Sequence, residues 1–347
     1  MKPSRTRSEL FSPAFGLRST HTQSLINSST YRRRIVRKRS RAMLDAEQDW
    51  ILDGGDDVRL LGHYSPQAGV SKGLVVLFHG WEGSSRSNYV VAAGGMLYDQ
   101  GFDVFRLNFR DHGESHHMNA GLFHSCRLAE VVHALQDIQR RTGAQDWALS
   151  GYSLGGNFAL RVAMAAPEAG LSLRQVVAVC PVISPSNTLK AMEDGPRGYE
   201  SYFIRKWAKS IKVKQSLFPD SCEYETWYKL GNLRERTGYL ATRHYEFESL
   251  EQYFDGYSIA GDRLKKITMP TTILTSEDDM VVPVSDFADL PDNDNIELII
   301  TRHGGHCAFL KNWKMESLAD DIIVERVLNS SRQDQLIERH PDGLKPQ

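Results

Sequence analysis

The segment at residues 147–160 constrains the fold of this chain more than any other. It reads WALSGYSLGGNFAL, a short apolar run that meets a G-x-S-x-G pattern and continues into an Ala- and Leu-rich segment. This order predicts a strand, a sharp turn and a helix, with Ser153 at the apex of the turn. An ordinary Gly/Ser turn is the alternative, because glycine is common in this chain. The flanking strand and helix patterns favour Ser153 as a nucleophile held above the edge of a sheet.

Apolar runs before and after this turn predict a sheet. Two short strands across a Gly/Asp turn, at residues 50–64, read as a hairpin. A continuous apolar run follows at 73–78, an alternating segment at 102–109, and further predicted strands at 175–182, 269–275 and 296–300. Runs of this kind are typical of strands buried on both faces of a parallel sheet, and helical patterns at 89–100 and 128–141 separate some of them. The fold class is therefore α/β, with a mostly parallel central sheet flanked by helices.

The alternating pattern breaks between residues 184 and 265. This part has no comparable strand but many aromatic residues in mostly helical spacing. An insertion before the next sheet strand is where a helical lid would lie, and its aromatic side chains could line an acyl pocket or hold the helices on the body. The chain then divides into a basic N-terminal arm (1–48), a first core part (49–183), a helical insertion (184–265) and a second core part (266–347).

Polar residues follow the last two predicted strands. Asp278 and Asp279 follow the strand at 269–275, and His303 and His306 follow the strand at 296–300. Together with Ser153 they give the chain order Ser, Asp, His, in which a carboxylate orients a histidine that activates a serine. Asp279 and His306 are the candidates for these roles, because Asp278 suits a turn hydrogen bond and His306 follows two glycines. Asp278 remains an alternative acid, and we expect His303 to lie at the surface or behind the site.

A glycine-rich loop follows the strand at 73–78. It reads HGWEGSS, and it lies where a sheet of this type needs backbone donors for a developing oxyanion. We expect these donors to be the amides of Trp81 and of Leu154, the residue after the nucleophile. His79 comes before the turn, so a structural hydrogen bond is its expected role.

The N-terminus has a different composition from the rest of the chain. Glu9 is the only acid among the first 44 residues, and residues 31–41 read YRRRIVRKRSR. Such a segment could be a transit peptide, a membrane- or nucleic-acid-binding run, or a solvated arm of the fold. The arm is favoured because it carries apolar anchors, namely Phe11, Phe15, Leu17, Leu25 and Ile26.

Composition limits the remaining functions. The formal net charge of −1 gives no reason to expect a polyanionic partner, and no binding module for nucleic acid is recognisable. Cys126, Cys180, Cys222 and Cys307 lack C-x-x-C spacing, so neither a disulfide framework nor a zinc site is predicted. The scattered histidines 112, 116, 117 and 124 lack a metal-ligand pattern. Without an apolar run long enough to span a bilayer, the expected location is the cytoplasm.

Several motifs together resemble one known family. They are F-x-P and HTQS near the N-terminus, HGWEGSS, N-F-R at 108–110, GYSLGGN and G-G-H at 304–306. This set is similar to that of the YheT-like α/β-hydrolases, which are related to abhydrolase-domain esterases and lipases, and the likeness runs over nearly the whole chain. The resemblance implies hydrolysis of carboxylic esters by a Ser/Asp/His triad without a cofactor. One departure is Met280, where such proteins often have proline after the two aspartates.

The expected substrate is a small-molecule or lipid ester with a short- to medium-chain acyl group. The alternatives are an acyltransferase or lipase-like enzyme with the same triad, and a non-catalytic binding protein on the same fold. Peripheral membrane contact through the basic arm belongs to the last of these.

Overall fold

The computed structural model describes residues 4–8, 11–220 and 224–339. Its strands are β1 (Ser4–Ser8), β2 (Gln48–Asp53), β3 (Arg59–Ser65), β4 (Leu74–Phe78), β5 (Asp103–Leu107), β6 (Trp147–Tyr152), β7 (Leu173–Val179), β8 (Thr271–Ser276) and β9 (Ile296–Thr301). Its helices are α1 (Thr20–Asn27), α2 (Thr30–Arg39), α3 (Arg41–Asp45), α4 (Asn88–Asp99), α5 (Leu128–Thr142), α6 (Leu154–Ala169), α7 (Pro185–Asp194), α8 (Arg197–Leu217), α9 (Glu225–Lys229), α10 (Leu233–Arg243), α11 (Leu250–Tyr257) and α12 (Leu318–Arg339), with 3₁₀ turns η1 (Gly261–Lys266) and η2 (Val284–Phe287).

In the described part of the chain the strands form one nine-stranded sheet in the order β1-β9-β8-β7-β6-β4-β5-β3-β2. The pairs from β1 to β5 in this order are parallel, and β3 and β2 add antiparallel neighbours at one edge. The predicted mostly parallel sheet is therefore confirmed. The carboxyl ends of β4, β6, β8 and β9 lie along one edge, which brings the loops that follow them together.

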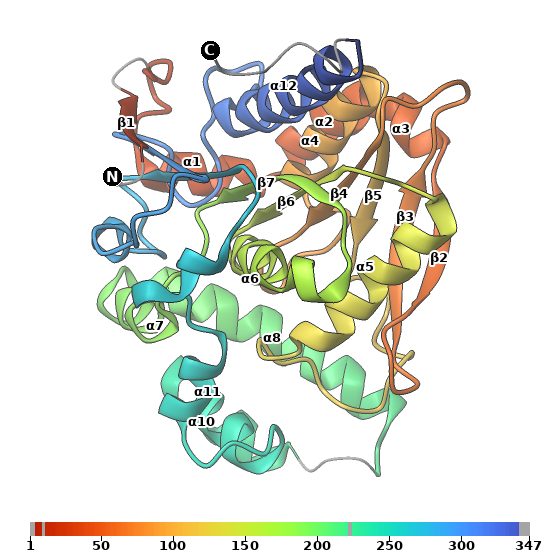
Figure 1. Ribbon diagram of the computed structural model, residues 1–347. Coiled ribbons are helices and arrows are strands. Elements are labelled where there is room, and N and C mark those ends of the chain that lie inside the picture. Colours follow the sequence, from red (N-terminus) through yellow and green to blue (C-terminus); the bar gives the residue numbers. More distant parts are fainter. Residues whose placement is uncertain (1–3, 9–10, 221–223, 340–347) are drawn as a thin grey trace.

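The sheet is buried on both faces. Along β4, Val75 and Leu77 pack into one apolar cluster, whereas Val76 and Phe78 pack into the other. This alternation follows from the period of two residues in a strand and explains why the sequence of β4 is apolar throughout. Helices α5 and α6 cover one face, while α2, α3 and α12 pack around α4 on the other (Figure 1).

Helices α7 to α11 and the turn η1 form an insertion between β7 and β8, as predicted (Figure 1). Some of its aromatic side chains are core residues, for example Trp227 and Tyr224, which are fully or almost fully buried. The division into arm, two core parts and insertion remains a prediction, although the insertion lies where it was expected.

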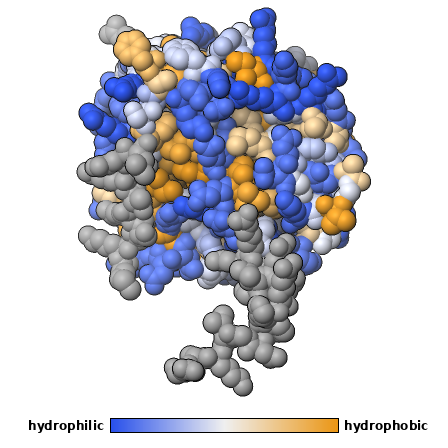
Figure 2. Space-filling model, turned by 90° about the horizontal axis from the view of Figure 1, so that it is seen from above, coloured by the Kyte–Doolittle hydropathy of each residue, from blue (hydrophilic) through white to orange (hydrophobic). Residues whose placement is uncertain are grey.

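The N-terminal segment is built into the fold more closely than a solvated arm. Strand β1 pairs in parallel with β9 at the sheet edge. Phe11 and Leu17 are buried, but Phe15 and Leu25 are exposed, so these two residues are not the apolar anchors that the sequence suggested. Seen from the side of α12, much of the surface is hydrophilic, with smaller hydrophobic areas between (Figure 2). Among the described residues, no helix combines the length and the apolar character needed to cross a membrane.

Candidate active site

The turn between β6 and α6 carries Ser153. Its backbone angles are φ 54° and ψ −118°, a strained conformation for a residue with a side chain. The turn is too tight for larger neighbours, since a Cβ at Gly151 would lie 2.1 Å from the carbonyl oxygen of Gly155. Both glycines are therefore required by close backbone approach. The result is a serine that is held at the carboxyl edge of the sheet and faces a cavity.

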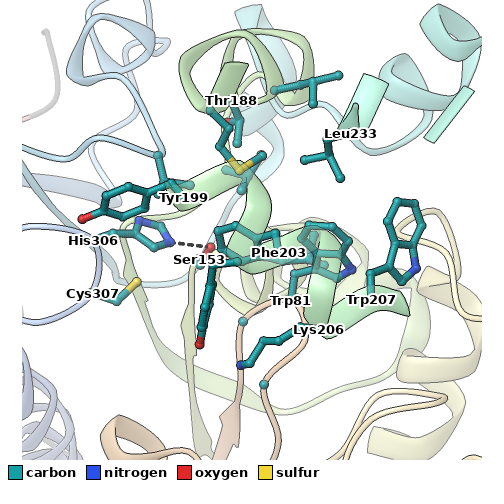
Figure 3. A pocket seen from close by; sticks show the side chains of 18 of the residues that line it. Trp81, Ser153, Thr188, Tyr199, Phe203, Lys206, Trp207, Leu233, His306 and Cys307 are labelled. Atoms are coloured by element: carbon teal, nitrogen blue, oxygen red, sulfur yellow. Dashed lines mark hydrogen bonds between the residues drawn. The ribbon is translucent and has the colours of Figure 1, made fainter. Parts of the chain in front are cut away.

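His306 and Asp279 meet Ser153 from the loops after β9 and β8. His306 Nε2 lies 2.9 Å from Ser153 Oγ, and His306 Nδ1 lies 2.9 Å from Asp279 Oδ2 (Figure 3). The other oxygen, Asp279 Oδ1, accepts hydrogen bonds from the amides of Val281 and Val282, at 2.8 and 3.1 Å. The structure thus brings together the three residues that the sequence singled out, with the carboxylate fixed on its far side.

The charges of this pair depend on each other. Burial disfavours the carboxylate of Asp279, but the His306 charge and hydrogen bonds from His306 and the two valine amides lower its pKa below the ordinary value. Burial likewise disfavours the imidazolium of His306, but the Asp279 carboxylate outweighs this effect and raises the pKa of His306. Asp279 is therefore ionised at neutral pH, and it stabilises any positive charge that His306 gains.

Asp278 and His303, the other candidates from the sequence, lie on the same two loops as Asp279 and His306. Asp278 Oδ1 accepts a hydrogen bond from the amide of Gly305 at 2.9 Å, so this carboxylate holds the loop that carries His306. His303 Nδ1 lies 3.8 Å from Asp278 Oδ2, on the side away from Ser153. The geometry favours Asp279 over Asp278 as the partner of His306.

The loop after β4 lies against the nucleophile. A Cβ at Gly80 would lie 3.2 Å from Ser153 Cβ, so glycine allows the loop to approach. His79 fixes the loop, because its Nδ1 donates to the carbonyl of Gly80 at 2.7 Å and its Nε2 accepts from the amide of Phe109 at 3.2 Å. Burial lowers the pKa of His79 to about 4, so the ring is neutral and has a structural role.

The amides of Trp81 and Leu154 are the expected oxyanion donors, and the residues after Trp81 hold its loop in place. The amide of Glu82 donates to His112 and the amide of Gly83 donates to Gly80, which fixes the loop on the far side of Trp81. The amides of Trp81 and Leu154 themselves make no hydrogen bond to another residue in the ranges that the structure describes. Such unbonded amides beside a serine are suited to bind a negative oxygen.

Comparison with known proteins decides the family. The family model described as alpha/beta hydrolase fold matches residues 73–312. The chain belongs to the alpha/beta hydrolase fold family. "Putative esterase YheT" of Escherichia coli (strain K12) is 28% identical over 271 residues, which cover 75% of this chain and 77% of that protein. Protein abhd-3.2 of Caenorhabditis elegans is 23% identical over 274 residues, which cover 76% of this chain and 68% of that protein.

Solved structures show the same fold. The alpha/beta hydrolase GrgF from Penicillium sp. sh18 matches with a TM-score of 0.52 at 16% identity, over 83% of this chain and 98% of that chain. The 2,6-dihydroxy-pseudo-oxynicotine hydrolase matches with a TM-score of 0.52 at 15% identity, over 89% of this chain and 78% of that chain. The resemblance inferred from the motifs, and the fold class that it implied, are confirmed.

A cavity of about 640 Å³ opens above Ser153 in this α/β-hydrolase. Its size lies within the range of small-molecule sites. Helix α8 and the other helices of the insertion supply a large part of the wall, and Figure 3 shows Phe203 and Trp207 on one side of Ser153 and Tyr199 on the other. The insertion thus lines the cavity with some aromatic residues, and others such as Trp227 pack inside the insertion. Both roles considered for these aromatic residues occur.

Sequence reasoning missed how the insertion is fixed to the oxyanion loop. The ring of Trp81 stacks on Phe203, with centroids 5.3 Å apart, and meets Trp207 edge-on at 5.1 Å. Lys206 Nζ donates to the carbonyl of Glu82 at 3.0 Å. These α8 residues lie at positions i, i+3 and i+4, so they share one face of a helix, and this spacing is the signal that could have identified them.

The N-terminal segment also reaches the cavity, which the sequence did not suggest. His21, Leu25 and Arg33 from α1 and α2 are among its lining residues. His21 Nδ1 lies 3.3 Å from the hydroxyl of Tyr199 on α8. The mouth is therefore built by two segments of the α/β-hydrolase that are far apart in the sequence.

Two clusters of the described residues bring metal-ligating atoms within 4.8 Å of one another: Cys180, His306 and Cys307, and Glu47, Asp49 and His63. In the first cluster both ring nitrogens of His306 already face Asp279 and Ser153, and burial raises the pKa of the Cys180 thiol well above its ordinary value. In the second, Arg86 and Arg106 already pair with Glu47. Neither donor set favours a resident metal over its present partners. Cys126, Cys180 and Cys307 are free thiols, and Cys222 lies outside the described residues.

Proposed function

We propose that this α/β-hydrolase cleaves carboxylic esters through an acyl-enzyme intermediate. Ser153 is the nucleophile, His306 is the general base and acid, and Asp279 orients His306. The observation that supports this most directly is the hydrogen-bonded series from Asp279 through His306 to Ser153, with 2.9 Å on each side of the imidazole. The fold of the chain and the name of the YheT relative agree with this reaction class.

The chemistry follows from these contacts. His306 Nε2 takes the proton of Ser153 Oγ as this oxygen attacks the ester carbonyl carbon, and Asp279 stabilises the imidazolium that forms. The amides of Trp81 and Leu154 bind the oxyanion. Collapse of this intermediate breaks the ester bond, and His306 gives its proton to the departing alcohol. A water molecule then repeats the sequence on the acyl-enzyme and releases the acid. No cofactor takes part.

The cavity supports an acyl group of short to medium length. Its volume of about 640 Å³ is limited, and its wall includes apolar side chains of the insertion such as Leu189, Met192 and Leu233. The substrate is therefore a small-molecule ester or a lipid ester with a modest acyl chain. Action in the cytoplasm and the division of the chain into arm, core and insertion remain predictions.

The test is hydrolysis of p-nitrophenyl esters from acetate to palmitate by the wild-type enzyme and by Ser153→Ala. We expect the variant to lose about 10³-fold or more in kcat while its thermal unfolding midpoint stays near that of the wild type. An optimum at short to medium chain length is expected from the cavity. A fully active, folded Ser153→Ala protein would refute the assignment.

Two other functions predict different outcomes of the same assay. An acyltransferase would use the same triad, and an added alcohol acceptor would then outcompete water for the acyl-enzyme. A lipase-like enzyme would also use it and would cleave an aggregated lipid ester faster than a soluble ester. A non-catalytic binding protein, including one held at a membrane by its basic segment, would turn over no ester and would not react with a fluorophosphonate probe.

A further inference from the structure

A second pocket of about 290 Å³ lies beside the cavity of Ser153, and its lining is cationic. The positively charged groups come from three segments: Arg33 and Arg37 from α2, Arg86 from the loop before α4, and Lys206 from α8. Arg33 and Lys206 also line the cavity of Ser153, as do Gly83 and Ser87. The two hollows are therefore contiguous across the oxyanion loop.

The positive charge of this pocket is only partly neutralised. Arg86 pairs with Glu47 at 2.5 Å, and Lys206 contacts a backbone carbonyl. Arg33 and Arg37 are exposed and make no ion pair with any other residue that the structure describes. They are also four positions apart on one helix, a like-charge spacing that destabilises a helix. An anion bound between them would remove this repulsion.

One carboxyl group lines the same pocket. It is Glu82, which burial drives towards its neutral form by raising its pKa to about 7, although the Lys206 charge opposes this shift. Glu82 therefore cancels less of the positive charge near neutral pH than an exposed glutamate would. The guanidinium groups are also the side chains best suited to bind phosphate or carboxylate through two parallel hydrogen bonds.

The oxyanion loop sets the distance between this pocket and the nucleophile. Gly80 lies against Ser153, and the amide of Gly83 closes a turn onto the carbonyl of Gly80 at 2.9 Å. A turn of this type spans less than about 7 Å between its end Cα atoms. In Figure 3, the apolar Leu233 lies higher in the view than Ser153, and Lys206 lies lower. An acyl chain on the Leu233 side would leave the alcohol part of the ester on the cationic side.

We propose that this pocket binds an anionic group, phosphate or carboxylate, on the alcohol part of the ester substrate. The proposal rests on the proposed ester hydrolysis and adds the class of alcohol that the enzyme accepts. The anionic group lies only a few bonds from the scissile ester oxygen, as in an acyl ester of a short phosphorylated or carboxylated alcohol. Arg33 and Arg37 bind it, and Lys206 adds positive charge from the side of the insertion.

The experiment compares octanoyl esters of three alcohols, glycerol, glycerol 3-phosphate and 3-hydroxypropionate, as dilute monomers at fixed ionic strength. We expect kcat/KM for at least one anionic ester to exceed that for the glycerol ester by about tenfold or more. The phosphate and carboxylate arms show which anion is preferred. Arg37→Glu is expected to reduce the ratio of anionic to neutral kcat/KM by at least about tenfold, mainly through KM.

Arg34→Glu is the matched control. Arg34 is exposed on the same helix and lines neither pocket, and its substitution changes the net charge equally. Its effect on the ratio is expected to stay below about threefold, because its side chain does not line the pocket and would make no hydrogen bond to the bound anion. Equal effects of the two substitutions would overturn the proposal, since they would show general electrostatic attraction. Equal turnover of all three esters by the wild type would also overturn it.

Two further outcomes distinguish this proposal from a membrane-binding role of the arginines and from failure of the proposed ester hydrolysis. If Arg37 matters only for esters presented in phosphatidylserine vesicles, the arginines bind a membrane surface and the proposal is wrong. If the folded wild type cleaves no ester, p-nitrophenyl esters included, the proposed function fails. The pocket is then judged by calorimetric binding of glycerol 3-phosphate alone, which Arg37→Glu must weaken and Arg34→Glu must not.

Discussion

Replacement of Asp279 by asparagine tests the proposed mechanism most sharply, because the structure specifies how the new side chain would sit. Asp279 Oδ1 accepts two amide hydrogen bonds, from Val281 and Val282, and Oδ2 is the oxygen nearer to His306 Nδ1, at 2.9 Å against 3.1 Å for Oδ1. An asparagine keeps the amide bonds if its oxygen takes the Oδ1 position. Its NH₂ group then faces His306 Nδ1 and donates to it. This reverses the tautomer of His306, so that Nε2 carries a proton and can no longer accept one from Ser153.

The expected loss follows from this wrong tautomer. The corresponding substitution in a serine protease triad costs about 10⁴-fold in kcat, which equals about 5.4 kcal/mol of transition-state stabilisation. The pH dependence should change as well. In the wild type, Asp279 raises the pKa of His306, so kcat/KM should rise with pH through a midpoint above 6.5, as His306 becomes neutral. Without the carboxylate, burial lowers the pKa of His306 and only the neighbouring Cys180 raises it, so the midpoint should fall.

The assay is kcat/KM for one p-nitrophenyl ester between pH 5 and 10, corrected for spontaneous hydrolysis. Asp278→Asn is the control, because an asparagine at this position can still accept from the amide of Gly305. We expect it to lose less than about tenfold, as a substitution outside the reacting groups. A large loss in Asp278→Asn with a small loss in Asp279→Asn would refute the assignment of the acid. A midpoint that does not move in Asp279→Asn would refute the electrostatic argument.

Two predictions concern stability. Lys214 is buried, and its Nζ lies 2.6 Å from the buried carboxylate of Asp111. Lys214→Ala should therefore lower the free energy of unfolding, measured by denaturant titration, by about 3–5 kcal/mol. The control Lys212→Ala changes an exposed residue and should change this free energy by less than about 0.5 kcal/mol. Equal effects would contradict the buried pair. Burial lowers the pKa of His79 to about 4, so on acidification the unfolded chain takes up this proton from pH 6.5 and the folded protein only near 4. Between pH 6.5 and about 4, the free energy of unfolding should fall by up to about 1.4 kcal/mol per pH unit because of this group. In His79→Asn the free energy of unfolding should depend less steeply on pH, and an unchanged pH dependence would exclude His79 as the cause.

The sequence was informative where structure depends on neighbouring residues. The elbow at Ser153 needs glycines within two positions of the serine, and the strand β4 needs only an unbroken apolar run, so both are visible locally. The chain order of Ser153, Asp279 and His306 also predicted that these residues meet, because each follows a strand and parallel strands end at one edge of the sheet. These features gave the sheet and the candidate site together.

Contacts between distant segments were not visible in this way. From the sequence, the arginine-rich run at 31–41 is interpreted as part of a solvated arm, because the apolar residues before it are expected to anchor the arm to the fold. As helix α2, it buries Arg32 and Val36, which are four positions apart, and exposes Arg33 and Arg37 on the adjoining face. Arg32 lies 3.7 Å from the buried Asp320 of α12, a partner far along the chain. The run has a helical period, but no nearby residue indicates which face of the helix packs against the rest of the protein.

The proposed chemistry of this α/β-hydrolase depends on local motifs, whereas its proposed selectivity depends on contacts between distant segments. Residues 73–312, which match the family model, contain Ser153, Asp279 and His306. Arg33 and Arg37 lie outside this range, on a helix that packs on the body and lines the cationic pocket. On the proposed function, the triad follows from fold and order, whereas selection of an anionic alcohol would depend largely on Arg33 and Arg37 outside the matched range, together with Lys206 inside it. A related chain with the same triad but without cations at these two positions should cleave esters without preference for an anionic alcohol.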